Sequence, residues 1–326
     1  MAKKKITGKS RAGKKPSKAE ANLSGNLLKT VAAVFLLLFL VVAAGFFFQK
    51  YYPLSTFRQP ESSESTASKY RHLKAAPPAY EIFPKQERIP PADRAIRKSP
   101  PGGLPRVAII IDDFGYDIDI ARKFSELNAE ITFAILPYSP QGKKIAQIAK
   151  AKNLEIMLHL PLEPSEYPRV NPGPGVLLSS MSPDALIEQL TKDLDFIPHI
   201  RGVNNHMGSE ITTISTKMYQ IFSILKKRDL FFVDSKTSSD SLCKPSARLL
   251  KLPFGERDVF LDHAVDSDSI RKQIRTLLRI AQRQGEAIGI GHPHKTTYQV
   301  LREKLPEIKA EVQLVKASSI VEIMGE

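Results

Sequence analysis

Hydrophobic and polar residues are arranged in three different ways along the chain. Residues 31–48 form an unbroken run of eighteen without a charged or strongly polar side chain. Residues 53–105 instead contain ten of the 24 prolines, a Ser-rich stretch and scattered basic residues. After Pro105, short β-branched runs alternate with amphipathic stretches at helical spacing, which is typical of βαβ units in a parallel sheet. The pattern therefore predicts an apolar segment, a linker and one folded α/β domain.

The hydrophobic pattern of the folded region predicts eight short strands. They are residues 107–111, 131–136, 155–158, 202–203, 230–233, 259–261, 287–291 and 312–315. Helices are expected between most of them, for example where Ser182 precedes Pro183, a typical helix start. The tail after Val315 is expected to form one closing helix. About 220 residues with seven or eight parallel strands predict a (β/α) barrel shorter than the usual eight-fold one, with an open doubly wound sheet as the alternative.

The apolar run predicts one transmembrane helix, which we place at residues 30–49. At roughly 1.5 Å per residue it nearly crosses a ~30 Å hydrocarbon core. Residues 1–29 carry nine Lys or Arg and one Glu, so the positive-inside rule places this basic segment in the cytoplasm. A buried core helix fits this context poorly. A cleavable signal peptide is the closer alternative, because residues 43–45 are small.

These features predict a single-pass inner-membrane protein of a Gram-negative-type envelope. Its N-terminus is expected in the cytoplasm, and the chain after the membrane helix is expected in the periplasm. Residues 50–105 are too rich in Pro and Ser to build a core and are expected to act as a flexible linker. Fifty-odd residues give a root-mean-square reach of ~40 Å, which is enough to hold residues 106–326 clear of the bilayer.

Charge and cysteine content exclude two classes of protein. The formal net charge is +14, but residues 107–326 hold 28 basic and 28 acidic residues. Because the folded region is neutral, we expect no nucleic-acid partner. Cys243 is the one cysteine of the sequence, which excludes an intramolecular disulfide framework and a zinc site built from cysteines.

Polar side chains with useful chemistry follow the predicted strands. They are Asp112 and Asp113, then His159, then Asn204, Asn205 and His206, then Asp234, Ser235 and Lys236, then Asp262 and His263, and finally His292 and His294. In a parallel barrel the carboxyl ends of the strands meet at one mouth. Taken singly, these residues are also compatible with helix caps, a buried core histidine or a loop ion pair. Their shared location favours one functional site.

A carboxylate with two imidazoles is typical of an open site for Zn²⁺ or a similar divalent ion. Such an ion lowers the pKa of water to ~7 and polarises a carbonyl oxygen, and hydrolysis of an amide needs both effects. A second carboxylate can then accept a proton and a histidine can donate one. The residue types therefore indicate metal-dependent hydrolysis.

At these positions the sequence resembles the divergent polysaccharide deacetylases, a branch of the NodB-like carbohydrate esterase superfamily. The matching segments are VAIIIDDFG at 107–115, ITFAILP at 131–137, MLHLPLE at 157–163, GVNNHMG at 202–208, FFVDSKT at 231–237 and IGIGHPH at 288–294. Together and in this order they are specific. The resemblance implies a distorted seven-stranded (β/α) barrel and the metal-dependent removal of N- or O-acetyl groups from a polysaccharide.

The resemblance also implies roles for particular residues. The Asp-Asp pair carries the general base onto Asp112 and a metal ligand onto Asp113, and the late histidine motif carries the general acid onto His292. The superfamily usually places two metal histidines three or four residues apart, whereas here Glu163 stands four residues after His159. Either Glu163 or His206 completes the metal site, and we favour His206.

The remaining candidates complete the hypothesis. Asn205, Asp234, Lys236 and His294 are expected to contact an acetylated cell-envelope glycan such as peptidoglycan. The alternative is a glycan-binding or scaffolding domain that has lost turnover. An aspartate-nucleophile phosphatase is a weaker alternative, because it needs an Asp two residues after the nucleophile, where this chain has Phe114.

Overall fold

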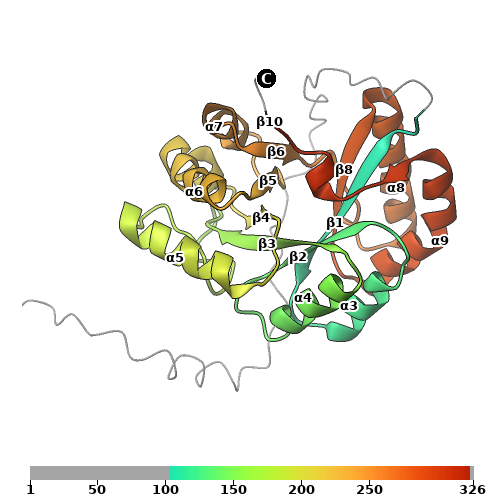
Figure 1. Cartoon of the computed structure of the whole chain (residues 1–326), viewed down its shortest axis with the longest axis horizontal. Helices are drawn as coiled ribbons and strands as arrows, with labels where there is room; N and C mark the ends of the chain where they lie inside the picture. The colour runs from blue at the N-terminus through green and yellow to red at the C-terminus, as the bar shows by residue number, and fades with distance from the viewer. Residues whose placement is uncertain (1–102, 324–326) are drawn as a thin grey trace, which may run out of the picture. The chain divides into compact units, whose positions relative to one another are not determined.

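A ten-stranded sheet forms the centre of residues 103–323, the part of the chain that the computed structural model describes. Helices pack around the outside of this curled sheet (Figure 1). Within residues 103–323, no helix combines the length and apolarity that a membrane crossing requires. The predicted membrane helix at 30–49 and nearly all of the predicted linker at 50–105 lie outside the described residues.

The strands are β1 (Arg106–Phe114), β2 (Ile131–Ile135), β3 (Glu155–Leu162), β4 (Gly202–Met207), β5 (Phe231–Asp234), β6 (Pro253–Glu256), β7 (Val259–Phe260), β8 (Glu286–Gly291), β9 (Gln313–Leu314) and β10 (Glu322–Ile323). The helices are α3 (Ile118–Ser125), α4 (Gly142–Ala151), α5 (Pro183–Phe196), α6 (Ser215–Lys227), α7 (Cys243–Leu250), α8 (Ser267–Gln284) and α9 (Lys295–Glu311), with short 3₁₀ turns η1 (Ile211–Thr213) and η2 (Ala317–Ser319). Ser182 caps α5 as predicted, with its hydroxyl accepting from the Ala185 N–H.

The strand order follows that of a barrel. The hydrogen-bonded path is β10-β6-β5-β4-β3-β2-β1-β8-β7, and β9 pairs with β1. Because successive strands from β1 to β6 lie side by side without a reversal, the doubly wound alternative is wrong. The pairings are parallel except that of β10 with β6, so the sheet is mixed.

The sheet is a curled half-barrel and not a closed seven-stranded ring. Within the described residues, β6 and β7 are the strands that would have to pair to close it, and they do not. The chain crosses the gap at Arg257 and Asp258, whose N–H groups donate to the carbonyls of Asp234 and Ile288. Two residues joining β6 to β7 leave too little chain for the crossover that two parallel neighbours need.

Both faces of the sheet are buried, and successive residues of β1 face different cores. Val107, Ile109 and Ile111 pack in an outer core under the helices, whereas Ala108 and Ile110 face an inner core. This alternation follows from the two-residue period of a strand. The inner row ends in polar side chains at the carboxyl end of the sheet, and this end therefore carries the candidate site.

The C-terminal tail closes the opposite end of the half-barrel. Instead of the predicted helix it forms η2 and β10. Ala317 and Ile320 are buried in the inner core, and the N–H groups of Ala317 and Ser318 donate to the side chains of Thr132 and Glu155. The prediction of a helix is wrong because these backbone groups bind strand side chains in place of a helical ladder.

Candidate metal centre

A β-bulge at the end of β1 brings both acidic residues to the site. Neighbouring residues of a regular strand point to opposite faces. Here the register of β1 against β2 shifts between Ile111 and Phe114, and Asp113 has φ 55° in the left-handed region. Asp112 and Asp113 are 2% and 4% exposed, and both line one cavity. Such a bulge commonly re-aims side chains beside active sites.

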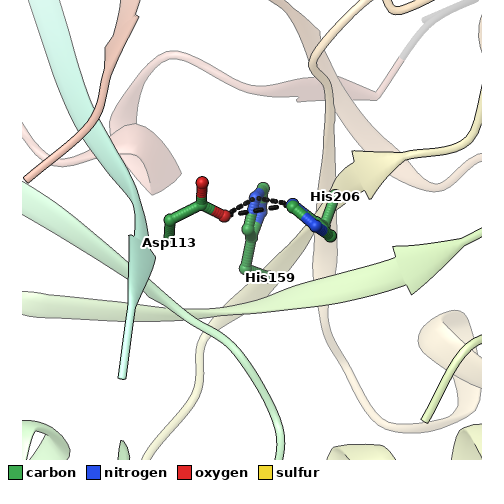
Figure 2. Close-up of side chains that lie close together, drawn as sticks. All are labelled: Asp113, His159 and His206. Carbon is green, nitrogen blue, oxygen red and sulfur yellow. Dashed lines mark hydrogen bonds and ion pairs between the residues drawn. The ribbon is translucent and has the colours of Figure 1, made fainter. Parts of the chain in front are cut away.

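Strands β3 and β4 supply the two imidazoles. His159 pairs in register with Asn204, and His206 lies two residues further along β4, on the same face as Asn204. Asp113 Oδ1 lies 3.0 Å from His206 Nδ1 and 3.2 Å from His159 Nε2, and the two nitrogens are 3.2 Å apart. Figure 2 shows the three side chains converging on one point from three different strands. The structure thus brings together the three predicted ligands.

These three atoms fit a divalent cation. Zinc bonds of ~2.0–2.1 Å in a tetrahedral arrangement separate ligand atoms by about 3.3 Å, close to the spacing found here. Asp113 Oδ1 is buried and has no hydrogen bond of good geometry to the described residues, although two ring nitrogens face it. The neighbouring cavity of about 30 Å³ can hold an ion or a water molecule. The cluster could therefore bind a metal ion.

The electrostatics of Asp113 agree with this arrangement. Burial opposes ionisation of its carboxyl group, but the imidazoles of His206 and His159 outweigh burial and hold the pKa of Asp113 well below its usual range. A carboxylate that stays ionised beside two imidazoles is a suitable metal ligand.

The structure places the two candidates for the last ligand differently. Glu163 follows β3, but its carboxylate accepts a hydrogen bond from the Ser179 N–H. Its backbone carbonyl accepts from the N–H groups of Glu210 and Ile211. Glu163 therefore holds the 163–182 connection against the end of β4, and His206 is the residue that reaches the cluster.

Asp112 lies beside the cluster with its own partners. Its Oδ2 is 3.7 Å from His159 Nε2, and its Oδ1 accepts a hydrogen bond of 2.7 Å from Asn204 Nδ2. Burial raises the pKa of Asp112, an effect that His159, His292 and Asn204 partly offset. A carboxylate with a raised pKa suits the acceptance of a proton.

His292 faces the cluster from the end of β8. Its Nε2 is 4.0 Å from Asp113 Oδ2, while its Nδ1 lies 2.8 Å from Asp262 Oδ1. The other oxygen of Asp262 accepts from the His292 N–H and from the Thr297 hydroxyl, both at 2.7 Å. Burial lowers the pKa of His292, but Asp262 outweighs burial and raises it to about 9.

From the sequence alone, Asp262 could be either a site residue or part of a loop ion pair. The structure places it beside His292. It lies two residues after Phe260, an inner-core residue of β7, just as His292 lies two residues after Ile290 of β8. This two-residue spacing is the sequence signal that could have found it. Asp262, His292 and His294 also form a second group of possible ligands, and within it Asp262 Oδ1 and His292 Nδ1 lie at the hydrogen-bond distance of 2.8 Å.

The predicted substrate residues are placed differently. Asn205 lines the cavity, yet its amide binds the backbone of Met207 and Ser235. Asp234 accepts from the Lys236 N–H and the Ser241 hydroxyl, and the Lys236 ammonium lies 3.4 Å from Glu256.

Neither Asp234 nor Lys236 is among the described residues that line the cavity. His294 occupies the N-cap position of α9, and its ring centroid lies 5.9 Å from that of His292. His263, also predicted near the mouth, is exposed, and its ring nitrogen lies 3.5 Å from the Gln273 amide.

Comparison with known proteins gives a family and relatives. The sequence profile of the divergent polysaccharide deacetylase family matches residues 109–321. The uncharacterized protein YibQ of Escherichia coli K12 is 31% identical over 241 residues, 74% of this chain and 75% of that protein. An uncharacterized protein of Haemophilus influenzae is 30% identical over 210 residues, 64% of this chain and 74% of its own length.

A solved structure shares the fold. The crystal structure of the uncharacterized protein ATU2773 of Agrobacterium tumefaciens C58 superposes with a TM-score of 0.65 at 28% sequence identity. The match covers 69% of this chain and 93% of that one.

Proposed function

Since the chain belongs to the divergent polysaccharide deacetylase family, we propose that it is a metal-dependent hydrolase that removes acetyl groups from a cell-envelope polysaccharide. The observation that carries the proposal is the convergence of Asp113 Oδ1, His159 Nε2 and His206 Nδ1 within 3.2 Å of one another. These three residues would hold a divalent cation, with Zn²⁺ as the best match to two imidazoles and one carboxylate. Once bound, the cation supplies positive charge that lowers the pKa of water and polarises the acetyl carbonyl oxygen.

Asp112 is the proposed general base. Its carboxylate borders the same cavity as the ligand cluster, and burial raises its pKa. A raised pKa makes the carboxylate a better proton acceptor near neutral pH. Asp112 takes one proton from the attacking water, whose oxygen forms the new bond to the acetyl carbon.

His292 is the proposed general acid. Asp262 keeps it protonated and fixes its Nδ1–H, so its Nε2–H points toward Asp113 and the cavity. As the bond between the acetyl carbon and the sugar nitrogen or oxygen breaks, His292 gives its proton to the departing atom. Acid and base steps of this kind each contribute typically ~10²- to 10⁴-fold in rate.

We also propose that this domain works outside the cytoplasm at the inner membrane. The proposal depends on the apolar run at residues 31–48, the basic residues before it and the Pro-rich stretch after it. In this arrangement residues 30–49 anchor the chain, residues 50–105 act as a tether and the catalytic domain reaches an acetylated glycan, with peptidoglycan as the first substrate to test.

The test combines metal content with acetate release. We expect the purified full chain in detergent to bind one equivalent of Zn²⁺ and to release acetate from acetylated peptidoglycan fragments. Asp113→Asn should lose metal and activity together, because it removes the charged ligand. Asp112→Asn should retain the metal and lose roughly 10²-fold or more in rate. Absence of stoichiometric metal from the wild-type chain would contradict the proposal.

The rival hypothesis, a glycan-binding domain without turnover, predicts a different outcome. It expects peptidoglycan fragments to bind equally well to wild type, Asp112→Asn and His292→Gln, with no acetate released by any of them. The intact acid and base beside the ligand cluster favour the hydrolase.

A further inference from the structure

The Asn204 side chain is fully buried between the proposed base and a proposed metal ligand. Its Oδ1 lies 3.0 Å from His159 Nδ1, and its Nδ2 donates to Asp112 Oδ1 at 2.7 Å. A third and longer contact of 3.4 Å joins Nδ2 to Ser235 Oγ. The residue is 0% exposed. A single amide therefore connects two parts of the site that have different chemical tasks.

The chemistry of Asp112 fixes which way this amide points. An ionised carboxylate accepts hydrogen bonds and cannot donate them, whereas an amide offers a donor NH₂ and an acceptor oxygen. In the structure the NH₂ group of Asn204 faces Asp112 and donates to its Oδ1 at 2.7 Å, whereas the opposite orientation would set the amide oxygen against this carboxylate oxygen. As a consequence, the amide oxygen must face His159.

The orientation of Asn204 in turn fixes the proton of His159. An acceptor oxygen 3.0 Å from Nδ1 requires the proton on Nδ1. The lone pair of the neutral ring then lies on Nε2, the atom that faces Asp113 Oδ1 and His206 Nδ1. A metal-binding histidine needs this arrangement, in which one nitrogen is free and the other is held by an outer partner.

We infer that Asn204 is a positioning residue that prepares the site for its cation by holding His159 in the Nδ1–H tautomer and Asp112 in its orientation. The purpose that we assign to Asn204 rests on the proposed metal-dependent function. The hydrogen bonds of its side chain do not depend on that function. Strand β4 thus contributes twice to the site, with Asn204 and His206 two residues apart on one face.

The first test uses the wild-type chain without metal. The sequence contains seven histidines, so a full chain labelled with ¹⁵N-histidine gives few imidazole signals. Burial lowers the pKa of His159, but Asp112 and Asp113 outweigh burial and raise it, so the spectra are recorded at a pH high enough for its ring to be neutral. We expect long-range ¹H–¹⁵N spectra, assigned with His159→Gln, to show this neutral ring protonated on Nδ1. Protonation of the neutral ring on Nε2 would overturn the inference, and this result needs no Asn204 variant to fold.

The second test separates the two contacts of the amide. Asn204→Leu removes both, and we expect Zn²⁺ affinity, measured by competition with a chromogenic chelator, to fall about 10- to 100-fold. Asn204→Asp retains an acceptor for His159 but faces Asp112 with an oxygen. It should therefore keep Zn²⁺ affinity at or above the wild-type value and the Nδ1–H tautomer, while acetate release falls.

Controls separate this inference from the proposed function. Ser235→Ala removes only the 3.4 Å contact and should change Zn²⁺ affinity less than twofold. Wild-type affinity and tautomer in a folded Asn204→Leu chain, or an equal loss of affinity in Asn204→Leu and Asn204→Asp, would overturn the inference and leave the metal site standing. Failure of the wild-type chain to bind Zn²⁺ would contradict the proposed function, while the tautomer of His159 would still test Asn204.

Discussion

In the proposed mechanism, Asp262 determines which proton His292 can give. Its carboxylate accepts the Nδ1–H of His292 at 2.8 Å, and the resulting pKa of about 9 keeps the imidazole charged near neutral pH. In Asp262→Asn the amide NH₂ can face Nδ1, which favours the neutral ring. We therefore expect acetate release to fall by roughly 10²-fold or more, with Zn²⁺ content unchanged.

The same substitution predicts a pH-dependent change in stability of the metal-free chain. The pKa of His292 rises from 6.5 to about 9 on folding, so the stabilisation is full below pH 6.5 and is lost as the pH rises through about 9. It corresponds to roughly 3 kcal/mol, or several degrees in Tm. The difference in Tm between wild type and Asp262→Asn should shrink between pH 6.5 and pH 9.5, and a constant difference would contradict this account.

Most of the site residues could be predicted because each lies within three residues after a short apolar run in the sequence. This holds for Asp112, Asp113, His159, His206 and His292. Position after a strand does not show where a side chain points once the chain turns. Lys236, for example, has φ 52° and pairs with Glu256 instead of lining the cavity.

The roles of Asn204 and Asp262 could not be predicted in the same way. Both depend on hydrogen bonds to partners distant in sequence, which no local pattern encodes. The Asn204 amide reaches Asp112 over 92 positions of the chain, and Asp262 reaches His292 over 30.

At the scale of the element, the second histidine of the cluster comes from strand β4. The superfamily pattern instead places both metal histidines on the loop after β3, where this chain has the 163–182 connection. Glu163 stands four residues after His159, where the usual second histidine would be, but its carboxylate binds the Ser179 N–H. His206 from β4 completes the cluster instead. The connection thereby has a structural role beside the site.

This arrangement predicts opposite results for two substitutions. Glu163→Gln keeps an acceptor for the Ser179 N–H and should leave Zn²⁺ stoichiometry at one with affinity within about threefold of wild type. His206→Gln should lose at least 10-fold in affinity, because it removes the Nδ1 ligand. Elemental analysis and chelator competition on both variants measure this. A loss of metal in Glu163→Gln alone would identify Glu163 as the ligand.

Strand positions could be predicted better than strand lengths. The fourth strand was predicted at residues 202–203 and extends over Gly202–Met207, because Asn204, Asn205 and His206 are polar yet buried. Strand β6 was missed because Pro253–Glu256 contains no β-branched residue. In both cases tertiary burial outweighs local propensity.

At the scale of the whole molecule, the barrel-like order could be predicted from the alternation of strands and helices, but its incomplete closure could not. The gap between β6 and β7 depends on a two-residue link, and the tail depends on Ala317 and Ile320 entering the inner core. Such long-range contacts leave little trace in a periodic pattern. The proposed anchor and tether depend on composition, so they call for a direct test in cells.

Cysteine labelling can test the proposed topology with low background. Cys243, the one cysteine in the sequence, is buried and fully shielded from solvent, so the wild-type chain should react little with a maleimide that cannot cross membranes. Leu249 is 73% exposed, and Leu249→Cys should react in intact spheroplasts. Ser17→Cys, in the basic segment, should react only after lysis.

If residues 30–49 form a membrane helix, the full chain should stay in the membrane pellet after an alkaline carbonate wash. Alkaline pH does not extract an apolar run of eighteen residues from the hydrocarbon core. A Leu249→Cys chain that reacts only after lysis would place residues 106–326 in the cytoplasm and contradict the proposal. Loss of the Ser17→Cys site from the mature chain would instead show that the segment is a cleaved signal peptide. The domain would then reach its glycan without an anchor, and the chemistry of the site would be unaffected.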